Sequence, residues 1–236
     1  WFQPDIRGMP WRKTRDPYAI WISEIMLQQT RVNAVIPYYQ RFMKRFPDVQ
    51  SLGRARIDTV LKLWEGMGYY SRARNLHQAA KMIVNNYQGK LPQTVSEMRK
   101  LPGIGPYTAG AIASIAFEAR EPVLDGNVIR VLCRVYMISA NPSQTKTRNQ
   151  LWRLADKLLP DKKIGDFNQA LMELGATVCL PANPLCGECP IAAVCRAKKR
   201  NQQNMFPVRF EKKPLPHYTV VAGIVWKNGK ILIDKR

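Results

Sequence analysis

The sequence predicts a mainly α-helical protein whose last residues begin a β-rich unit. Three observations support this fold class. Apolar residues recur at helical spacing through about the first 200 residues, residues that cap helices separate these segments, and β-branched residues gather after residue 217. The 236 residues are enough for one large domain or two small ones.

The first hundred residues contain several predicted helices with recognisable ends. Asp16 followed by Pro17 is typical of a helix start, because aspartate caps the first turn and proline suits its first position. Glycine or proline follows most of the apolar segments and is expected to end them. The predicted helices cover residues 18–27, 32–46, 57–64 and 71–87, and a capping box at residues 94–97 opens another.

Residues 101–110 (LPGIGPYTAG) are predicted to form a tight hairpin between two helices. Gly103 and Gly105 permit backbone angles that are closed to other residues, and Pro106 suits the first position of the next helix. Free N–H groups at such a helix start attract phosphate. Asp125 lies twenty residues beyond Gly105. A phosphate-binding hairpin beside a carboxylate suits an enzyme that acts on DNA or RNA.

The remaining residues continue as helices and then change character. Helices are predicted over residues 106–117, 128–136, 149–158 and 167–178. Small residues in the first of these let other helices pack closely, so we expect it to be central. Residues 201–217 carry prolines and basic residues and are predicted to be a linker. Beyond it, Asn228-Gly229 between two β-branched segments is typical of a β-hairpin turn.

The charge balance indicates a polyanionic partner. Lysine and arginine number 37 against 17 acidic residues, a formal net charge of +20. Each phosphate that such a surface neutralises releases counterions, which favours binding to nucleic acid. No apolar segment approaches the roughly 18 residues of a membrane-spanning helix, and no signal peptide is visible. We therefore expect a polyanionic partner and no membrane, and the alternative is a protein that is merely basic.

Four of the five cysteines fall within 17 residues, with the spacing C-x6-C-x2-C-x5-C: Cys179, Cys186, Cys189 and Cys195. Nothing suggests secretion, so disulfides are not expected. Four clustered thiolates suit either tetrahedral zinc or an iron–sulfur cluster, and the spacing alone leaves both open. Cys133 lies apart on an apolar helix face and is expected to be a core residue.

Taken in order, these motifs resemble the helix–hairpin–helix DNA glycosylases that carry a Gly/Pro-rich loop and an aspartate. Within them, the chain is similar to the MutY-type adenine glycosylases. The similarity runs from residue 10 to residue 195. Its most specific pieces are WISEIMLQQT at 21–30, GMGYYSR at 66–72, the hairpin, LDGNV at 124–128 and the cysteine spacing.

The resemblance implies a two-domain helical architecture. Residues 17–130 would form a six-helix barrel that carries the hairpin, and residues 1–16 and 131–200 a domain that holds a four-iron, four-sulfur cluster on the four cysteines. After the linker, residues 218–236 would be the start of a truncated, Nudix-like C-terminal domain.

The resemblance also implies an activity in base excision repair. Such proteins remove adenine mispaired with 8-oxoguanine, or with guanine, from duplex DNA after flipping it out of the stack. We expect a monomer that binds double-stranded DNA. Its location would be the cytoplasm, at the nucleoid, in a bacterium, or the nucleus or mitochondrion in a eukaryote.

Cleavage of an N-glycosidic bond needs a proton for the leaving base and an anion for the developing positive charge on the sugar. Two carboxylates can supply both, as in glycoside hydrolysis. Glu24 would be the acid, because burial on an apolar helix raises a carboxyl pKa. Asp125 would stay ionised and stabilise the sugar, with Tyr107 and Asn127 as supports. The alternatives are a solvated Glu24 and an Asp125 that only caps a helix.

The resemblance assigns the remaining site residues to base and DNA contacts. Trp11 and Arg12 should line the adenine pocket, and Gln169 should read the edge of the base. The residues expected to contact DNA are Gln29, Thr30, Tyr69, Arg72, Arg74, Gly103, Ile104 and Gly105, of which the first three would enter the duplex. The alternative for Tyr69, without the resemblance, is core packing.

Tyr107 separates the leading hypothesis from a rival with the same fold. Bifunctional enzymes of the endonuclease III type, which excise damaged pyrimidines, carry a lysine at this position that forms a Schiff base and cuts the strand. Because Tyr107 lacks that amine, we predict base removal without strong strand cleavage. A second rival is a non-catalytic iron–sulfur protein that only binds DNA, against which Glu24 and Asp125 argue.

Overall fold

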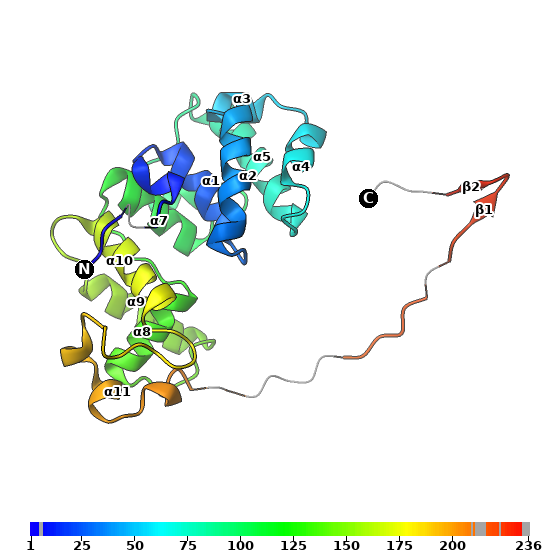
Figure 1. Cartoon of the computed structure of the whole chain (residues 1–236). Coiled ribbons are helices and arrows are strands. Elements are labelled where there is room, and N and C mark those ends of the chain that lie inside the picture. The colour runs from blue at the N-terminus through cyan, green and yellow to red at the C-terminus, as the bar shows by residue number, and fades with distance from the viewer. Residues whose placement is uncertain (5–6, 209, 211–215, 222, 233–236) are drawn as a thin grey trace.

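The computed structural model describes residues 1–4, 7–208, 210, 216–221 and 223–232. As predicted, the chain is mainly helical, with one short β-hairpin near its end (Figure 1). The elements in chain order are η1 (Pro10–Lys13), α1 (Pro17–Leu27), α2 (Val32–Arg45), α3 (Val49–Gly53), α4 (Ile57–Trp64), α5 (Tyr70–Asn86), α6 (Val95–Met98), α7 (Pro106–Phe117), α8 (Gly126–Tyr136), α9 (Thr145–Lys157), α10 (Ile164–Thr177), η2 (Ala192–Val194), α11 (Arg196–Lys199), η3 (Gln203–Met205), β1 (Trp226–Lys227) and β2 (Lys230–Ile231).

Local capping explains where the predicted helix boundaries are right and where they are wrong. Asp16 accepts backbone N–H bonds from Tyr18 and Ala19, which confirms the predicted start of α1. The starts of α9 and α10 lie about three or four residues earlier than predicted, because neither helix has a side-chain cap to mark it. The predicted capping box before α6 is only half formed, since Thr94 caps Glu97 N–H while the Glu97 carboxylate bonds elsewhere.

Helix α7 is central, as its small residues predict. It packs against α1, α6 and α10. Its residues from Thr108 to Ile115 are all buried. A Cβ atom on Gly165 of α10 would lie 2.7 Å from the Ser114 carbonyl oxygen, so the two helices approach too closely for a larger residue. Since α10 also packs against α8, it joins the earlier helices to the later ones (Figure 1).

The C-terminal hairpin forms at the predicted turn. β1 and β2 pair antiparallel, with Trp226 opposite Ile231, and Asn228 and Gly229 both have positive φ as a tight hairpin turn requires. The strands are shorter than predicted, and residues 218–221 form none. Much of the predicted linker (209 and 211–215) and the end of the last segment (222 and 233–236) lie outside the described residues. The Nudix-like assignment stays a prediction.

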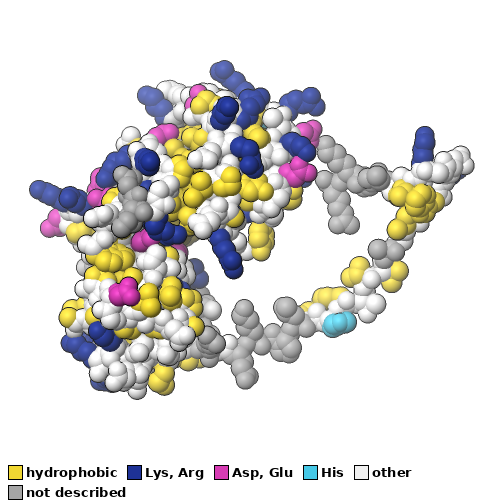
Figure 2. All heavy atoms as spheres, viewed as in Figure 1, with side chains coloured by type: hydrophobic (Ala, Val, Ile, Leu, Met, Phe, Trp, Pro, Cys, Tyr) yellow, Lys and Arg dark blue, Asp and Glu magenta, His cyan; other side chains and the backbone are white. Residues whose placement is uncertain are grey.

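The surface of the protein is rich in basic side chains, as the composition predicts (Figure 2). Lysine and arginine side chains are spread over the face in Figure 2, with few acidic side chains between them. Within the described ranges, no helix is long and apolar enough to cross a membrane.

Candidate active site

One cavity of about 220 Å³ collects most of the residues that the sequence assigned to chemistry. It lies among η1, α1, α7, α10 and the start of α8. Its lining residues are Arg7, Met9, Trp11, Arg12, Ile20, Ser23, Glu24, Leu27, Thr30, Val32, Tyr107, Ile115, Asp125, Asn127, Gln169, Met172, Glu173 and Ala176. Segments that are more than 150 residues apart in the sequence thus meet around a single space.

Glu24 is a buried carboxyl with an unusually high proton affinity. It lies in the last turn of α1, and only 7% of its surface is exposed. Burial raises the pKa of Glu24 from 4.5 to about 7, and the negative charge of Asp125 acts in the same direction. The hydrogen bond from Tyr107 Oη to Glu24 Oε2, 2.8 Å long, opposes the rise. At neutral pH this group is therefore poised to give a proton.

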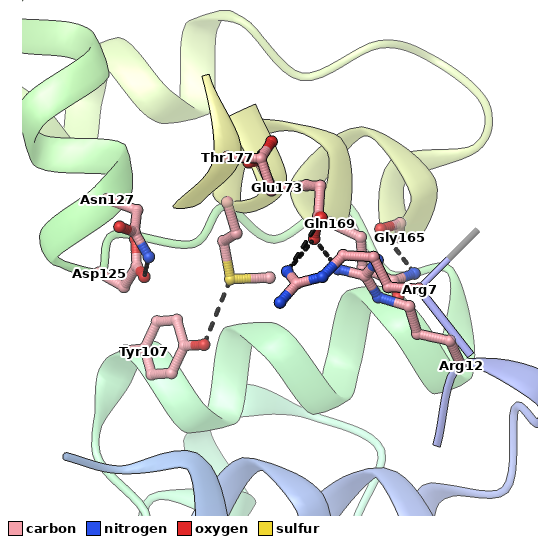
Figure 3. A network of polar contacts seen from close by, with 10 residues as sticks. Arg7, Arg12, Tyr107, Asp125, Asn127, Gly165, Gln169, Glu173 and Thr177 are labelled. Carbon is pink, nitrogen blue, oxygen red and sulfur yellow. Dashed lines mark hydrogen bonds and ion pairs between the residues drawn. The ribbon is translucent and has the colours of Figure 1, made fainter. Parts of the chain in front are cut away.

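Asp125 is a partly buried carboxyl that accepts two N–H donors. It is the N-cap of α8, accepting the Val128 backbone N–H at 2.7 Å and the Asn127 side-chain amide at 2.9 Å. Burial raises the pKa of Asp125, and these two hydrogen bonds oppose the rise. The capping role and the predicted site role of Asp125 thus coexist. Figure 3 shows Asp125, Asn127 and Tyr107 on one side of the site.

On the other side of the site, Glu173 pairs with two arginines (Figure 3). Glu173 lies 3.0 Å from Arg7 Nη1 and 2.6 Å from Arg12 Nη2. Sequence reasoning missed Arg7 and Glu173; the available signal was that Glu173 lies one helical turn after Gln169 on α10. Arg12 Nη1 is buried and has no hydrogen-bond partner among the described residues. A donor without a partner beside a cavity is suited to a ligand acceptor.

The other two predicted pocket residues also line the cavity. Trp11 is buried by an edge-to-face contact with Tyr39, with the ring centroids 5.2 Å apart. The Gln169 amide donates weakly to the Gly165 carbonyl one turn earlier, at 3.3 Å, which leaves its oxygen available.

A chain of hydrogen bonds runs from Asp125 toward the cysteine-rich segment. Asn127, which donates to Asp125, accepts from Arg130 Nη2 at 2.8 Å. Arg130 Nε in turn donates to the Cys179 carbonyl at 2.7 Å. The loop that contains the first cysteine is therefore tied to the carboxylate of the site.

The four predicted metal-ligating cysteines line one small, mainly apolar cavity of about 20 Å³. Burial raises the pKa of Cys186, and the charges of Cys179 and Cys195 act in the same direction. Arg134 Nη1 donates to Cys179 Sγ at 3.2 Å. Within the described part of the chain, no three His, Cys, Asp or Glu side chains are arranged to hold a metal ion. The all-sulfur donor set nevertheless has the chemistry that an iron–sulfur cluster needs.

The hairpin differs from its prediction at two of its three assigned residues. Gly103 has φ +78°, so glycine is needed there. Gly105 has φ −87° and is the extended N-cap of α7, so no special backbone angle requires glycine. The Ile104 side chain is buried and its N–H bonds to the Leu101 carbonyl, so neither is free to contact DNA.

Of the five other predicted DNA contacts, three are exposed, one lines the cavity and one is buried. Tyr69 is 60% exposed rather than packed in the core, and Gln29 and Arg74 are also exposed. Thr30 lines the cavity. Arg72 is 8% exposed and its guanidinium donates to backbone carbonyls, which corrects its assignment as a DNA contact.

Comparison with known proteins agrees with this geometry. Residues 22–157, more than half of the chain, match the model of the HhH-GPD superfamily of base excision DNA repair proteins. The chain is 49% identical over 212 residues to the adenine DNA glycosylase of Mus musculus, covering 86% of this chain and 41% of the relative. It is 43% identical over 231 residues to the enzyme of the same name from Buchnera aphidicola subsp. Baizongia pistaciae, covering 98% and 65%.

Two solved structures have the same fold. A thermostable thymine-DNA glycosylase superposes with a TM-score of 0.76 at 31% identity, covering 83% of this chain and 90% of that one. Endonuclease III in a non-covalent complex with DNA superposes with a TM-score of 0.69 at 22% identity, covering 80% and 87%. The chain spans about two-fifths of the length of the mammalian relatives. The motifs, the cavity and these matches together place the chain in the HhH-GPD superfamily of base excision DNA repair proteins.

Proposed function

We propose that the protein is a monofunctional adenine DNA glycosylase that removes adenine mispaired with 8-oxoguanine, or with guanine, from duplex DNA. The observation that carries the proposal is the pair of carboxyls in one cavity, Glu24 with a pKa of about 7 and Asp125 with N–H donors. The names of the curated relatives support adenine as the base. We further propose that the protein acts as a monomer.

The two carboxyls divide the chemistry of N-glycosidic cleavage. Glu24 donates its proton to a ring nitrogen of the flipped adenine, so that the base leaves as a neutral molecule. Asp125 remains ionised and faces the sugar, where it stabilises the positive charge that develops as the C–N bond breaks. Water then adds to the sugar carbon, and the proton it releases restores the acid.

The opposite wall of the cavity provides recognition of the base. The unpaired Arg12 Nη1 can donate to an acceptor on the adenine ring, and Trp11 provides an apolar wall. Glu173 pairs with both Arg7 and Arg12 and fixes where their remaining donors point. Hydrogen-bond donors and acceptors on the edge of a flipped base are what such pockets read.

Strand cleavage is not expected from this site. A lyase of this fold needs an amine beside the sugar, and the described lining residues include no lysine. Tyr107 Oη is instead bonded to Glu24 and to Met172 Sδ, at 2.8 and 3.2 Å. Covalent trapping with borohydride should therefore give no protein–DNA adduct.

We also propose that Cys179, Cys186, Cys189 and Cys195 hold a four-iron, four-sulfur cluster. The cluster would supply a rigid crosslink for a loop that has little core of its own. Arg130 and Arg134 already hold the Cys179 end of this loop against α8. An absorption spectrum with iron and sulfide analysis tests the assignment, and a colourless protein loaded with zinc would contradict it.

The test of the main proposal uses four duplexes that carry adenine opposite 8-oxoguanine, guanine or thymine, or thymine opposite guanine. Each is incubated with the protein and then heated in alkali to reveal abasic sites. Adenine release opposite 8-oxoguanine, lost in Glu24→Gln and Asp125→Asn, is the expected result. Release of thymine but not adenine would instead favour the activity named for the thermostable structural relative.

A further inference from the structure

Arg72, which the resemblance suggested as a DNA contact, is buried in the first turn of α5. Its Nη1 lies 3.1, 3.0 and 2.5 Å from the carbonyl oxygens of Ile25, Met26 and Gln28. These carbonyls belong to the C-terminal end of α1, whose last oxygens have no partner within the helix and carry the negative end of its dipole. Arg72 therefore caps the helix turn that carries Glu24.

The other terminal nitrogen of Arg72 contacts both the turn that follows α1 and the turn that precedes α5. Nη2 lies 3.2 Å from Thr30 Oγ1, 3.2 Å from the Met67 carbonyl and 3.3 Å from the Gly68 carbonyl. The guanidinium carbon also lies 5.5 Å from the centroid of the Tyr69 ring. One side chain thus bonds both to the turn after α1 and to the turn before α5.

Each of these two turns holds one non-glycine residue in left-handed backbone conformation. Gln29 has φ +57° and Tyr69 has φ +48°, angles that side chains disfavour and that persist only where the surroundings hold them. Gln29 directly follows Gln28, and Tyr69 directly follows Gly68, whose carbonyls both bond to Arg72. The same guanidinium holds the residue before each strained position.

We propose that Arg72 is a positioning residue that locks the two turns to the last turn of α1, so that Gln29 and Tyr69 meet the duplex in a fixed relation to Glu24. The part of this inference that concerns DNA rests on the proposed function. A lysine could not replace the arginine, because one ammonium group cannot reach acceptors on both sides as the planar fork does.

The first experiment needs no DNA. Hydrogen exchange is measured in the whole protein for wild type, Arg72→Lys and the matched control Arg54→Lys, whose side chain is exposed. Arg72→Lys should speed exchange in residues 26–32 and in residues 65–71 together, by roughly tenfold or more, and leave α8 unchanged. Unchanged exchange in either turn, or a uniform increase through the whole chain, would overturn the inference.

The second experiment separates positioning from binding. With duplex that carries adenine opposite 8-oxoguanine, Arg72→Lys should slow single-turnover base release by roughly tenfold or more and change the Kd by less than about threefold, since phosphate contacts dominate affinity. The fluorescence rise of 2-aminopurine placed beside the target pair should fall in parallel. A rate and a fluorescence change equal to those of Arg54→Lys would refute the role.

Chemical rescue provides a check that is independent of general destabilisation. Arg72→Ala should regain base release with millimolar ethylguanidinium and not with ethylammonium, because only the former has the fork; equal rescue by both would contradict the inference. If wild type releases no adenine, the proposed function has failed, and the exchange experiment still decides whether Arg72 couples the two turns.

Discussion

Replacing Glu24 by glutamine should make the protein more stable while it abolishes base release. Folding raises the pKa of Glu24 from 4.5 to about 7, so the folded state binds the proton more tightly than the unfolded state. The favourable contribution of Glu24 to the free energy of unfolding is fully present below pH 4.5 and is lost as the pH rises through about 7. Glutamine resembles the protonated form at every pH and keeps an acceptor for Tyr107.

The magnitude follows from the size of this change. A rise from 4.5 to about 7, at about 1.4 kcal/mol per pKa unit, corresponds to about 3 kcal/mol. We expect Glu24→Gln to exceed wild type in free energy of unfolding by about this amount at pH 7.5. The difference should shrink as the pH falls toward 4.5, where wild-type Glu24 is protonated in both states.

Urea unfolding followed by tryptophan fluorescence at several pH values measures this difference, because Trp21 and Trp64 are fully buried reporters. Glu97→Gln is the matched control. Hydrogen bonds from Lys100 and Tyr87 lower the pKa of Glu97, so this substitution should lower the free energy of unfolding at neutral pH rather than raise it. A Glu24→Gln variant no more stable than wild type at pH 7.5, or a difference that does not depend on pH, would refute the reasoning.

Two further predictions concern the site and the hairpin. Tyr107→Phe removes the hydrogen bond that lowers the pKa of Glu24, so the alkaline fall in single-turnover rate, expected near pH 7 in wild type, should move to higher pH; an unmoved profile would count against the bond. Gly103→Ala should lower the free energy of unfolding by about 1–2 kcal/mol, because φ is +78° and the new Cβ would lie 3.0 Å from Asn75 Cβ. Gly105→Ala should change the free energy of unfolding by less than about 0.5 kcal/mol, because the new Cβ meets open space and the backbone angles are ordinary. Equal losses of stability in the two variants, measured by thermal or urea unfolding, would contradict this difference between the two glycines.

The sequence predicts the fold well where side chains mark the element ends. α1 and α7 carry a cap or an N1 proline before a long apolar segment, and both were predicted to within a residue. α10 begins after Lys163, which has a left-handed backbone conformation and makes no side-chain cap, so no local sequence signal marks the start of this helix. α3, with five residues, is too short for periodicity to reveal, although Asp48 caps it.

The residues of the candidate site likewise fall into those that local motifs predict and those that only tertiary contacts reveal. Glu24 and Asp125 stand in specific local motifs and can be found from sequence alone. The pairing of Arg7 with Glu173 joins residues 166 positions apart, and no local pattern predicts such a contact. The burial of Arg72 likewise depends on tertiary contacts. From sequence alone, an arginine close to the exposed Tyr69 would be taken for a surface charge, because the two turns that bury it cannot be predicted locally.

The position of Asp125 at the start of α8 affects how its variants should be judged. Removing its carboxylate removes the cap of the helix that carries Arg130 and Arg134 to the cysteine loop. An alanine here would therefore combine three defects in one phenotype: a lost reaction, a frayed helix and a loosened cysteine loop. Asparagine caps helices about as well as aspartate, so Asp125→Asn is the substitution that isolates the missing charge. A clinical or evolutionary variant at this residue can thus be inactive for reasons unrelated to the reaction it faces.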